Sequence, residues 1–277
     1  MINLNKKMIV QSTITSSIQP LLENVSSFKR FKGCYTMVGS LERTDRCGKQ
    51  YWIMQLSDIS TVLNIYCFNM NDFMQHLHTN TLVHIEATLK YIKGQQYIRC
   101  AFLQKVSDQT SKSLLDINAI ASFYCPDPLL LIRLKTIINI IQSDYLKQFL
   151  SDVLVNNEIG INYLQCPASL RNHHNYKGGL LEHSIDVAER IIKNYSLEGT
   201  ELDIAIIGAL IHDIGKTQTL SPNGTRTSLG MVVDHDELCL EICAQALKSL
   251  DENEPQSALL LRHILTCANP GSRYGYQ

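Results

Sequence analysis

The sequence predicts a multidomain protein of α and β structure, in which a five-stranded β-barrel precedes an all-α domain. Strand-forming residues dominate from Phe31 to about Val106, and beyond them apolar residues recur at helical spacing. With 277 residues and 45% hydrophobic content, the chain is long enough to fill two cores. We therefore expect one domain over residues 1–110, including an N-terminal arm, and a helical domain over residues 111–277.

The N-terminal region holds five strand-like stretches separated by turn signals. Gly48-Lys49 marks the first turn, Lys93-Gly94 marks the last, and one helix-like piece at residues 71–78 lies between the third and fourth stretches. This order is typical of an OB-fold, a Greek-key barrel whose open face often binds single-stranded nucleic acid. The predicted strands are residues 34–44, 50–58, 61–70, 82–94 and 96–106.

The two predicted domains differ in charge, although the whole chain has a net charge of only -1. Residues 1–110 contain 12 Lys and Arg against 7 Asp and Glu, whereas the remainder contains 13 against 19. A basic barrel favours contact with phosphates, and aromatic side chains on strands can stack on bases. The same aromatics can equally pack the barrel core, because the sequence does not fix their face. The candidate nucleic-acid-binding residues are Tyr35, Arg43, Arg46, Lys49, Trp52, Tyr66, Tyr91, Tyr97 and Arg99.

Composition excludes several classes of protein. No apolar run approaches the roughly 18 to 20 residues of a membrane span, and the first residues lack the apolar block of a secretory signal. The nine cysteines form no CxxC pair, so neither a zinc ribbon nor a disulfide framework is indicated. We expect a cytoplasmic protein with reduced thiols and no membrane partner, and the sequence leaves a homo-oligomer open.

The chain after the barrel changes to helical periodicity. The polar stretch at residues 107–113 is the expected linker. Apolar residues at helical spacing follow at 129–141, preceded by Pro126 and Pro128, and at 145–155, started by Ser143 or Asp144. The second domain is therefore predicted to be mainly helical.

A histidine and a His-Asp pair lie on two successive predicted helices. His183 follows Gly178-Gly179 on an amphipathic stretch, and its place beside the apolar stripe predicts that its ring faces inward. The next helix is apolar nearly all round and ends in His212-Asp213. Burying a carboxylate there costs several kcal/mol unless a cation or a full set of hydrogen bonds compensates. A bound metal would compensate, and a hydrogen-bonded His-Asp pair in the core is the alternative.

Two further histidines are predicted to face the interior. His235 lies in the first turn of a helix above Cys239, and His263 lies among Leu259 and Leu260 on a helix that begins at Pro255. Each could by itself be an ordinary core or capping histidine. Lys216 lies just beyond the His-Asp pair, where its charge can neutralise a phosphate oxygen.

The motifs GGLLEHS and GALIHDIGK resemble the HD phosphohydrolase superfamily. More narrowly, HHNYKGGLLEH, IHDIGK, VDHDE and LRHIL in this order, behind an OB-like domain, resemble the YhaM-type 3′ to 5′ exoribonucleases. The resemblance covers roughly residues 30 to 275. The GGLLEH element is also similar to the HD domains of conjugative relaxase-type proteins.

The resemblance implies a metal site. His183, His212 and Asp213 would be metal ligands, while His235 and His263 would hold a second metal or bind the scissile phosphate. Imidazole ligands favour Mn, Fe, Co, Ni or Zn over Mg, and of these we expect Mn, as one or two ions. Lys216 would assist electrostatically. His174, which precedes the glycines, would orient or protonate the leaving group.

The implied function is a metal-dependent nuclease or phosphodiesterase acting on single-stranded RNA or DNA, in the 3′ to 5′ direction. The motif departs from the family pattern in two respects. The Asp that closes it, on a helix after the position of His263, is absent, and Ala268 and Asn269 stand where the exoribonucleases have a paired His. We therefore expect the helical domain to lack its last helix. Two alternatives stay open: a single-strand-binding accessory protein of DNA transfer with weak or no catalysis, and an HD nucleotide phosphohydrolase whose OB-like part is regulatory.

Overall fold

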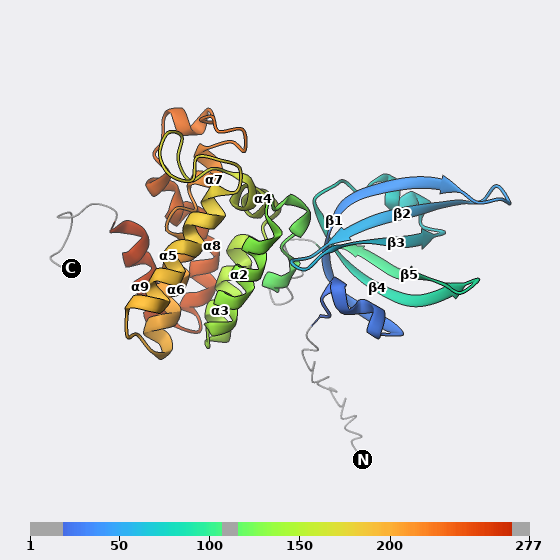
Figure 1. Ribbon diagram of the computed structural model, residues 1–277, viewed down its shortest axis with the longest axis horizontal. Helices are drawn as coiled ribbons and strands as arrows, with labels where there is room; N and C mark the ends of the chain where they lie inside the picture. Colours follow the sequence, from blue (N-terminus) through green and yellow to red (C-terminus); the bar gives the residue numbers. More distant parts are fainter. Residues whose placement is uncertain (1–18, 107–115, 268–277) are drawn as a thin grey trace, which may run out of the picture.

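The computed structural model describes residues 19–106 and 116–267, and it places a β-barrel beside a bundle of helices (Figure 1). The predicted linker at 107–113 and the N-terminal arm before residue 19 lie outside the described residues. No helix in the described part of the chain is both long and apolar enough to cross a membrane.

The barrel closes in the strand order β1-β2-β3-β5-β4. β3 and β5 pair in parallel and the other neighbours pair antiparallel, so the five strands leave no open sheet edge. The predicted five-stranded OB-like barrel is therefore confirmed. Its elements are the 3-10 helix η1 (Leu22–Ser27), β1 (Arg30–Thr44), β2 (Gln50–Ser57), β3 (Val62–Phe68), α1 (Asn71–Gln75), β4 (Thr81–Ile92) and β5 (Gln95–Lys105).

Alternation along the strands divides side chains between the barrel core and its outer surface. Met54, Ile65 and Ile85 are fully buried in the core. Tyr35 is also fully buried, and its hydroxyl donates to the Pro20 carbonyl at 2.7 Å. The prediction that Tyr35 binds nucleic acid is therefore wrong, because the register of β1 turns this ring into the core.

The region after the barrel is helical, as predicted. The Asp127 carboxylate accepts from Leu129 N at the start of α2, and the Ser143 hydroxyl accepts from Leu146 N at the start of α3. The elements are η2 (Ile117–Ala119), η3 (Ser122–Tyr124), α2 (Pro128–Ile140), α3 (Asp144–Leu154), α4 (Asn157–Gln165), α5 (Gly179–Asn194), α6 (Gly199–Ile211), α7 (Lys216–Thr219), η4 (Leu229–Met231), α8 (His235–Asp251) and α9 (Pro255–Thr266).

Helix α6 is buried in the centre of the helical region. Ile206, Ile207, Leu210 and Ile211 on this helix are fully buried, which agrees with a helix that is apolar all round. It contacts α5 and α9, and all three belong to one continuous hydrophobic core. The polar residues at the end of α6 are thus carried by the most enclosed helix of the region.

Residues 116–125 join the barrel to the helices. Ile59 N donates to the Asn118 carbonyl at 2.9 Å, and the Thr36 hydroxyl donates to the Ala119 carbonyl at 3.1 Å. Cys34, Ile59 and Leu82 of the barrel are buried in the same core as the helices. The two regions therefore share apolar packing as well as hydrogen bonds.

Candidate metal centre and nucleic-acid interface

Two consecutive glycines bring the start of α5 against the loop that carries His174. Gly178 has a φ of 87°, a left-handed conformation that favours glycine. A Cβ on Gly179 would lie 2.1 Å from the His174 carbonyl oxygen, so only glycine allows this close approach. The glycine pair thus fixes both the loop and the first turn of α5, on which His183 lies one turn later.

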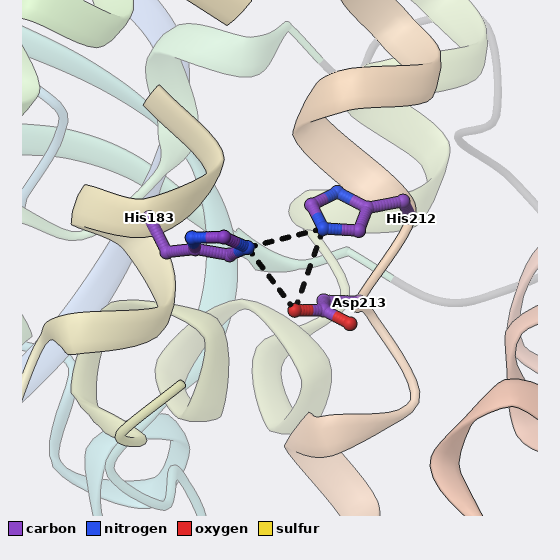
Figure 2. Close-up of side chains that lie close together, drawn as sticks. All are labelled: His183, His212 and Asp213. Carbon is purple, nitrogen blue, oxygen red and sulfur yellow. Dashed lines mark hydrogen bonds and ion pairs between the residues drawn. The ribbon is translucent and has the colours of Figure 1, made fainter. Parts of the chain in front are cut away.

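His183 from α5 meets His212 and Asp213 from the end of α6 (Figure 2). The Nε2 atoms of the two histidines are 3.2 Å apart. Asp213 Oδ2 lies 3.5 Å from His183 Nε2 and 3.4 Å from His212 Nε2. Within residues 19–106 and 116–267 this is the one group of three or more His, Cys, Asp or Glu whose ligand atoms all lie within 4.8 Å of each other.

The spacing of these three atoms fits the coordination shell of one transition metal. Metal–nitrogen bonds of about 2.1 Å with tetrahedral or octahedral angles place neighbouring ligand atoms roughly 3.0 to 3.5 Å apart. Two neutral imidazoles and one carboxylate are also the donor set of such metals, whereas Mg²⁺ prefers oxygen and water. His183, His212 and Asp213 can therefore hold a metal ion without large rearrangement.

The hydrogen bonding of His212 leaves its inward nitrogen free to bind. His212 Nδ1 lies 2.8 Å from the Ala209 carbonyl oxygen. A carbonyl oxygen can only accept, so Nδ1 carries a proton and, in the neutral ring, Nε2 presents its lone pair towards His183 and Asp213. A backbone partner of this kind orients metal-binding histidines in proteins.

Asp213 is the most buried of the polar groups at this site, with its side chain 9% exposed. Burial alone would raise its pKa, but hydrogen bonds from His235 and Lys216 and the charge of His212 outweigh burial, so the pKa lies well below its ordinary value. The Lys216 ammonium donates to Oδ2 at 2.6 Å. Asp213 is thus held as a carboxylate, the form that binds metals.

His183 is kept neutral by its surroundings. Burial lowers its pKa from the ordinary value, and the nearby His212 and Lys216 lower it further against the opposing charge of Asp213. A neutral imidazole offers a lone pair for coordination. The ring is about one-third exposed, so the site is reachable from solvent.

His235 lies on the other side of the Asp213 carboxylate. Its Nε2 is 3.2 Å from Asp213 Oδ1 and also 3.2 Å from Asp236 Oδ1. A Cβ on Gly215 would lie 1.9 Å from the His235 carbonyl, so Gly215 lets the start of α8 approach the end of α6. The two oxygens of Asp213 therefore face different histidines, and a role of His235 as a second-metal ligand stays a prediction.

His174 lies beside the three-residue cluster, within a polar network. Its ring centroid is 5.6 Å from that of His183. His174 Nδ1 is 3.1 Å from the Tyr176 hydroxyl, which also donates to Glu182, and Nε2 is 3.6 Å from Asp186 Oδ2. Tyr176, Glu182 and Asp186 were not predicted as site residues from the sequence. The spacing of Glu182 and Asp186, one turn apart on the helix of His183, is a signal that could have found them.

His263 does not face the interior, and this prediction is wrong. Helix α9 buries Ala258, Leu261 and Leu265, and position 263 lies between the last two on the opposite side of the helix. The ring is exposed, with both nitrogens 3.3 Å from Cys267 Sγ. A role of His263 as a ligand stays a prediction.

A cluster of aromatic rings covers the outer side of β2, β3 and β5. Tyr51 stacks on Phe68 with ring centroids 5.4 Å apart, and the Tyr66 ring meets that of Tyr97 edge-on at 5.7 Å. The Arg99 guanidinium lies 5.5 Å from the centroid of the Phe68 ring. The structure thus brings Tyr66, Tyr97 and Arg99 together as predicted candidates and adds Tyr51 and Phe68, which sequence reasoning missed because it could not fix strand register.

The remaining predicted nucleic-acid-binding residues lie elsewhere. Arg43, Arg46 and Lys49 are exposed on the hairpin between β1 and β2. Tyr91 is 66% exposed near the end of β4. Trp52 alternates with Tyr51 and Ile53, is partly buried and packs against the barrel core, so its contact with nucleic acid stays a prediction.

The chain was compared with known proteins. No family model matches it. Over 200 residues, 70% of this chain, it is 24% identical to the 3′-5′ exoribonuclease YhaM of Shouchella clausii, of which the match covers 60%. The resemblance to YhaM-type exoribonucleases is confirmed. The chain is also 42% identical over 65 residues to the dihydroneopterin 2′,3′-cyclic phosphate phosphodiesterase of Methanocaldococcus jannaschii, covering 21% of this chain and 26% of that one.

The chain thus matches less than two thirds of the length of each of these relatives. Among solved structures, it is similar to a mitochondrial single-stranded DNA-binding protein of S. cerevisiae, at 16% identity and a TM-score of 0.26. That match covers 29% of this chain and 97% of the other. The OB-like assignment itself depends on the closed barrel and its strand order.

Proposed function

We propose that this protein is a metal-dependent hydrolase that cleaves phosphodiester bonds of single-stranded nucleic acid from the 3′ end. The observation that carries the proposal is the convergence of His183, His212 and Asp213, with ligand atoms 3.2 to 3.5 Å apart. Its similarity to relatives named as 3′-5′ exoribonucleases supports the direction of attack. We propose Mn as the metal, with Fe, Co, Ni or Zn as further candidates.

The proposed mechanism assigns a role to each residue of the site. His183, His212 and Asp213 would hold the metal, which would lower the pKa of a water molecule and act as a Lewis acid at the phosphate. The Lys216 ammonium, which donates to Asp213 Oδ2, would turn towards a phosphate oxygen of the bound strand. His174, between Tyr176 and Asp186, is the candidate that orients or protonates the leaving oxygen.

We propose that the barrel supplies the binding surface for the strand. The ring cluster of Tyr51, Tyr66, Phe68 and Tyr97 offers faces on which bases stack, and Arg99 offers a positive charge for a phosphate. Base stacking is tolerant of sequence, which suits an enzyme that removes nucleotides in succession. We thus assign strand binding to residues 1–110 and hydrolysis to residues 111–277.

The proposal is tested with end-labelled single-stranded RNA and DNA of one sequence, incubated with Mn²⁺. Wild type should shorten the strands from the 3′ end, whereas His212→Ala and Asp213→Ala should abolish shortening. His78→Ala is the matched control because His78 is exposed in the barrel region, away from the cluster. Equal product from wild type and the two site variants would contradict the proposal.

A second candidate function is hydrolysis of a small phosphodiester. The 42% identity over 65 residues to a relative named as a cyclic phosphate phosphodiesterase favours it. Barrel and helices share a core, so point variants separate the two functions better than deletion of the barrel. Tyr66→Ala should impair shortening of polymers if they are the substrate, and it should leave turnover of 2′,3′-cyclic nucleotides unchanged.

A further inference from the structure

A β-bulge turns one aromatic ring of the barrel out into solvent. Ala87 pairs with Cys100 and Glu86 with Phe102, so Ala101 is an extra residue on β5. Cys100 is buried, and strict alternation from it would place Phe102 inside the core as well. The bulge instead leaves Phe102 44% exposed, opposite the surface residue Glu86. Bulges often re-aim a side chain beside a functional site, so Phe102 is a candidate binding residue.

Phe102 borders a hollow between β5 and α1. The hollow has a volume of about 540 Å³, within the range of roughly 300 to 1,000 Å³ of small-ligand pockets. A second exposed ring, Phe73, lines it from α1. The described residues that line the hollow are Asn69, Met70, Asn71, Asp72, Phe73, Ala101, Phe102 and Leu103.

The chemistry of this lining suits an uncharged planar group. Among the described residues that form the hollow, Asp72 alone is charged, and its negative charge disfavours a phosphate. The Phe73 and Phe102 rings offer apolar faces, while Asn69 and Asp72 offer groups that hydrogen-bond to the edge of a ring. A nucleobase combines these two properties.

The hollow continues the aromatic cluster of the barrel. Tyr66 on β3 is level with Arg99 on β5, and the two strands run parallel. Two residues further along, β3 ends at Phe68 and β5 reaches Ala101. The chain from Phe68 leads directly into Asn69 of the hollow, and Arg99 lies over the Phe68 ring between the two surfaces.

We propose that the hollow binds one base of the same single strand that stacks on the aromatic cluster, with the intervening phosphate at Arg99. This inference rests on the proposed function, since it adds a base site to the strand path of the barrel. The base lies between Phe102 and Phe73, and Asp72 accepts hydrogen bonds from its N–H groups. Bases with two adjacent N–H donors, as guanine has, bind best to a carboxylate.

The test measures binding of labelled 12-nucleotide single strands to the full chain by fluorescence anisotropy, with a chelator present to prevent hydrolysis. Phe102→Ala, Phe73→Ala and Phe102→Leu should each raise Kd about 5- to 150-fold, the effect of losing one stacked base. Phe28→Ala is the matched control, because Phe28 is also 44% exposed and does not line the hollow. Its Kd should stay within about twofold of wild type. Circular dichroism verifies that each variant folds.

Strands with a single abasic position identify the base in the hollow. Removing that base should weaken binding to wild type but not to Phe102→Ala, and the two losses should not add. If the three hollow variants bind like wild type while Tyr66→Ala binds weakly, the hollow site is wrong and the proposed barrel interface stands. If wild type binds no strand, both fail. Equal losses at every abasic position in wild type and Phe102→Ala would also overturn the inference.

Discussion

The proposed strand-binding face of the barrel and the proposed metal site differ in how their side chains are held. On the barrel, partly exposed rings such as Tyr66 and Tyr97 contact mainly each other, across three strands. At the metal site, Asp213 is buried and contacted by Lys216, His212 and His235. The first arrangement spreads its contacts over a surface, whereas the second depends on one carboxylate. We therefore expect substitutions to weaken the barrel face gradually and to disable the metal site at once.

Outside the proposed metal ligands, the largest loss of activity is expected at Gly215. Its alanine Cβ would lie 1.9 Å from the His235 carbonyl, so Gly215→Ala must push α8 away from Asp213. We expect nuclease activity to fall about 10²-fold, the cost of a misplacement near 1 Å. The free energy of unfolding should fall by about 1 to 3 kcal/mol. Activity assays and denaturant unfolding measure these changes.

Gly39→Ala is the control for this substitution. A Cβ on Gly39 would meet only the end of the flexible Gln55 side chain, at 2.8 Å. Activity within about twofold of wild type is therefore expected for Gly39→Ala. If Gly215→Ala retained full activity, the close approach of α6 and α8 would not matter to the site.

On the barrel side, Tyr66→Ala should weaken binding of single strands without changing metal content. Tyr66 contacts both Tyr51 and Tyr97, so its loss removes the centre of the ring cluster. We expect Kd to rise about tenfold, within the range for one stacked base. Binding titrations measure the affinity for single strands, and elemental analysis measures the metal content. A loss of metal from Tyr66→Ala would show that the two regions are not separable.

Acidification should affect the metal site before the barrel face. A protonated imidazole cannot bind a metal, so affinity should fall as pH decreases through the lowered pKa of His183. Above the ordinary histidine value of about 6.5 the ring is neutral and affinity should be nearly constant. The free energy of unfolding should also fall on acidification. The unfolded chain protonates His183 near the ordinary pKa of about 6.5, whereas the folded chain protonates it only at lower pH. The contribution of neutral His183 to the free energy of unfolding is therefore complete above about pH 6.5 and is lost as pH falls towards the lowered pKa. Competition with a chromophoric chelator across pH measures the affinity, and a rise in affinity on acidification would contradict the account.

The smallest effect is expected at Tyr176. Its hydrogen bond to Glu182, together with burial and the charges of Glu182 and Asp186, raises its pKa to about 12, so the hydroxyl stays a donor at neutral pH. Tyr176→Phe removes its hydrogen bonds to Glu182 and His174 but leaves the metal ligands in place. We expect kcat to fall about threefold, a loss near 0.6 kcal/mol, with metal content unchanged. If the Tyr176→Phe protein bound less metal than wild type, Tyr176 would support metal binding as well as the hydrogen bonding of His174.

Much of the fold was predictable because its signals are local. β-prone stretches with turn glycines predict the barrel, and helical spacing of apolar residues predicts the helices. The His212-Asp213 pair was predictable because a polar pair at the end of an apolar helix needs compensation. The inward placement of Tyr35 and Trp52 was not predictable, because the face of a strand residue depends on register and bulges, including the shift between Met37 and Gly39.

Helix phase and loop geometry explain the other differences. His263 is two residues from both Leu261 and Leu265, and the buried face of α9 follows those two leucines. The network of Tyr176 forms because His174 adopts a left-handed φ of 58° in a loop, which the sequence pattern does not encode. The side-chain placements that depend on contacts between distant segments were thus the ones that the sequence did not predict.

The proposed function requires that His183, His212 and Asp213 together hold a transition metal, and counting the metal ions that the chain binds tests this requirement. Metal-free protein should be titrated with Mn²⁺ and Zn²⁺, and the bound ions counted after dialysis, for wild type, His183→Ala, His212→Ala and the control His78→Ala. We expect at least one ion per chain for wild type and the control, and a loss of affinity of at least tenfold for the two site variants. Equal metal content in all four proteins, or none in wild type, would contradict the proposed function.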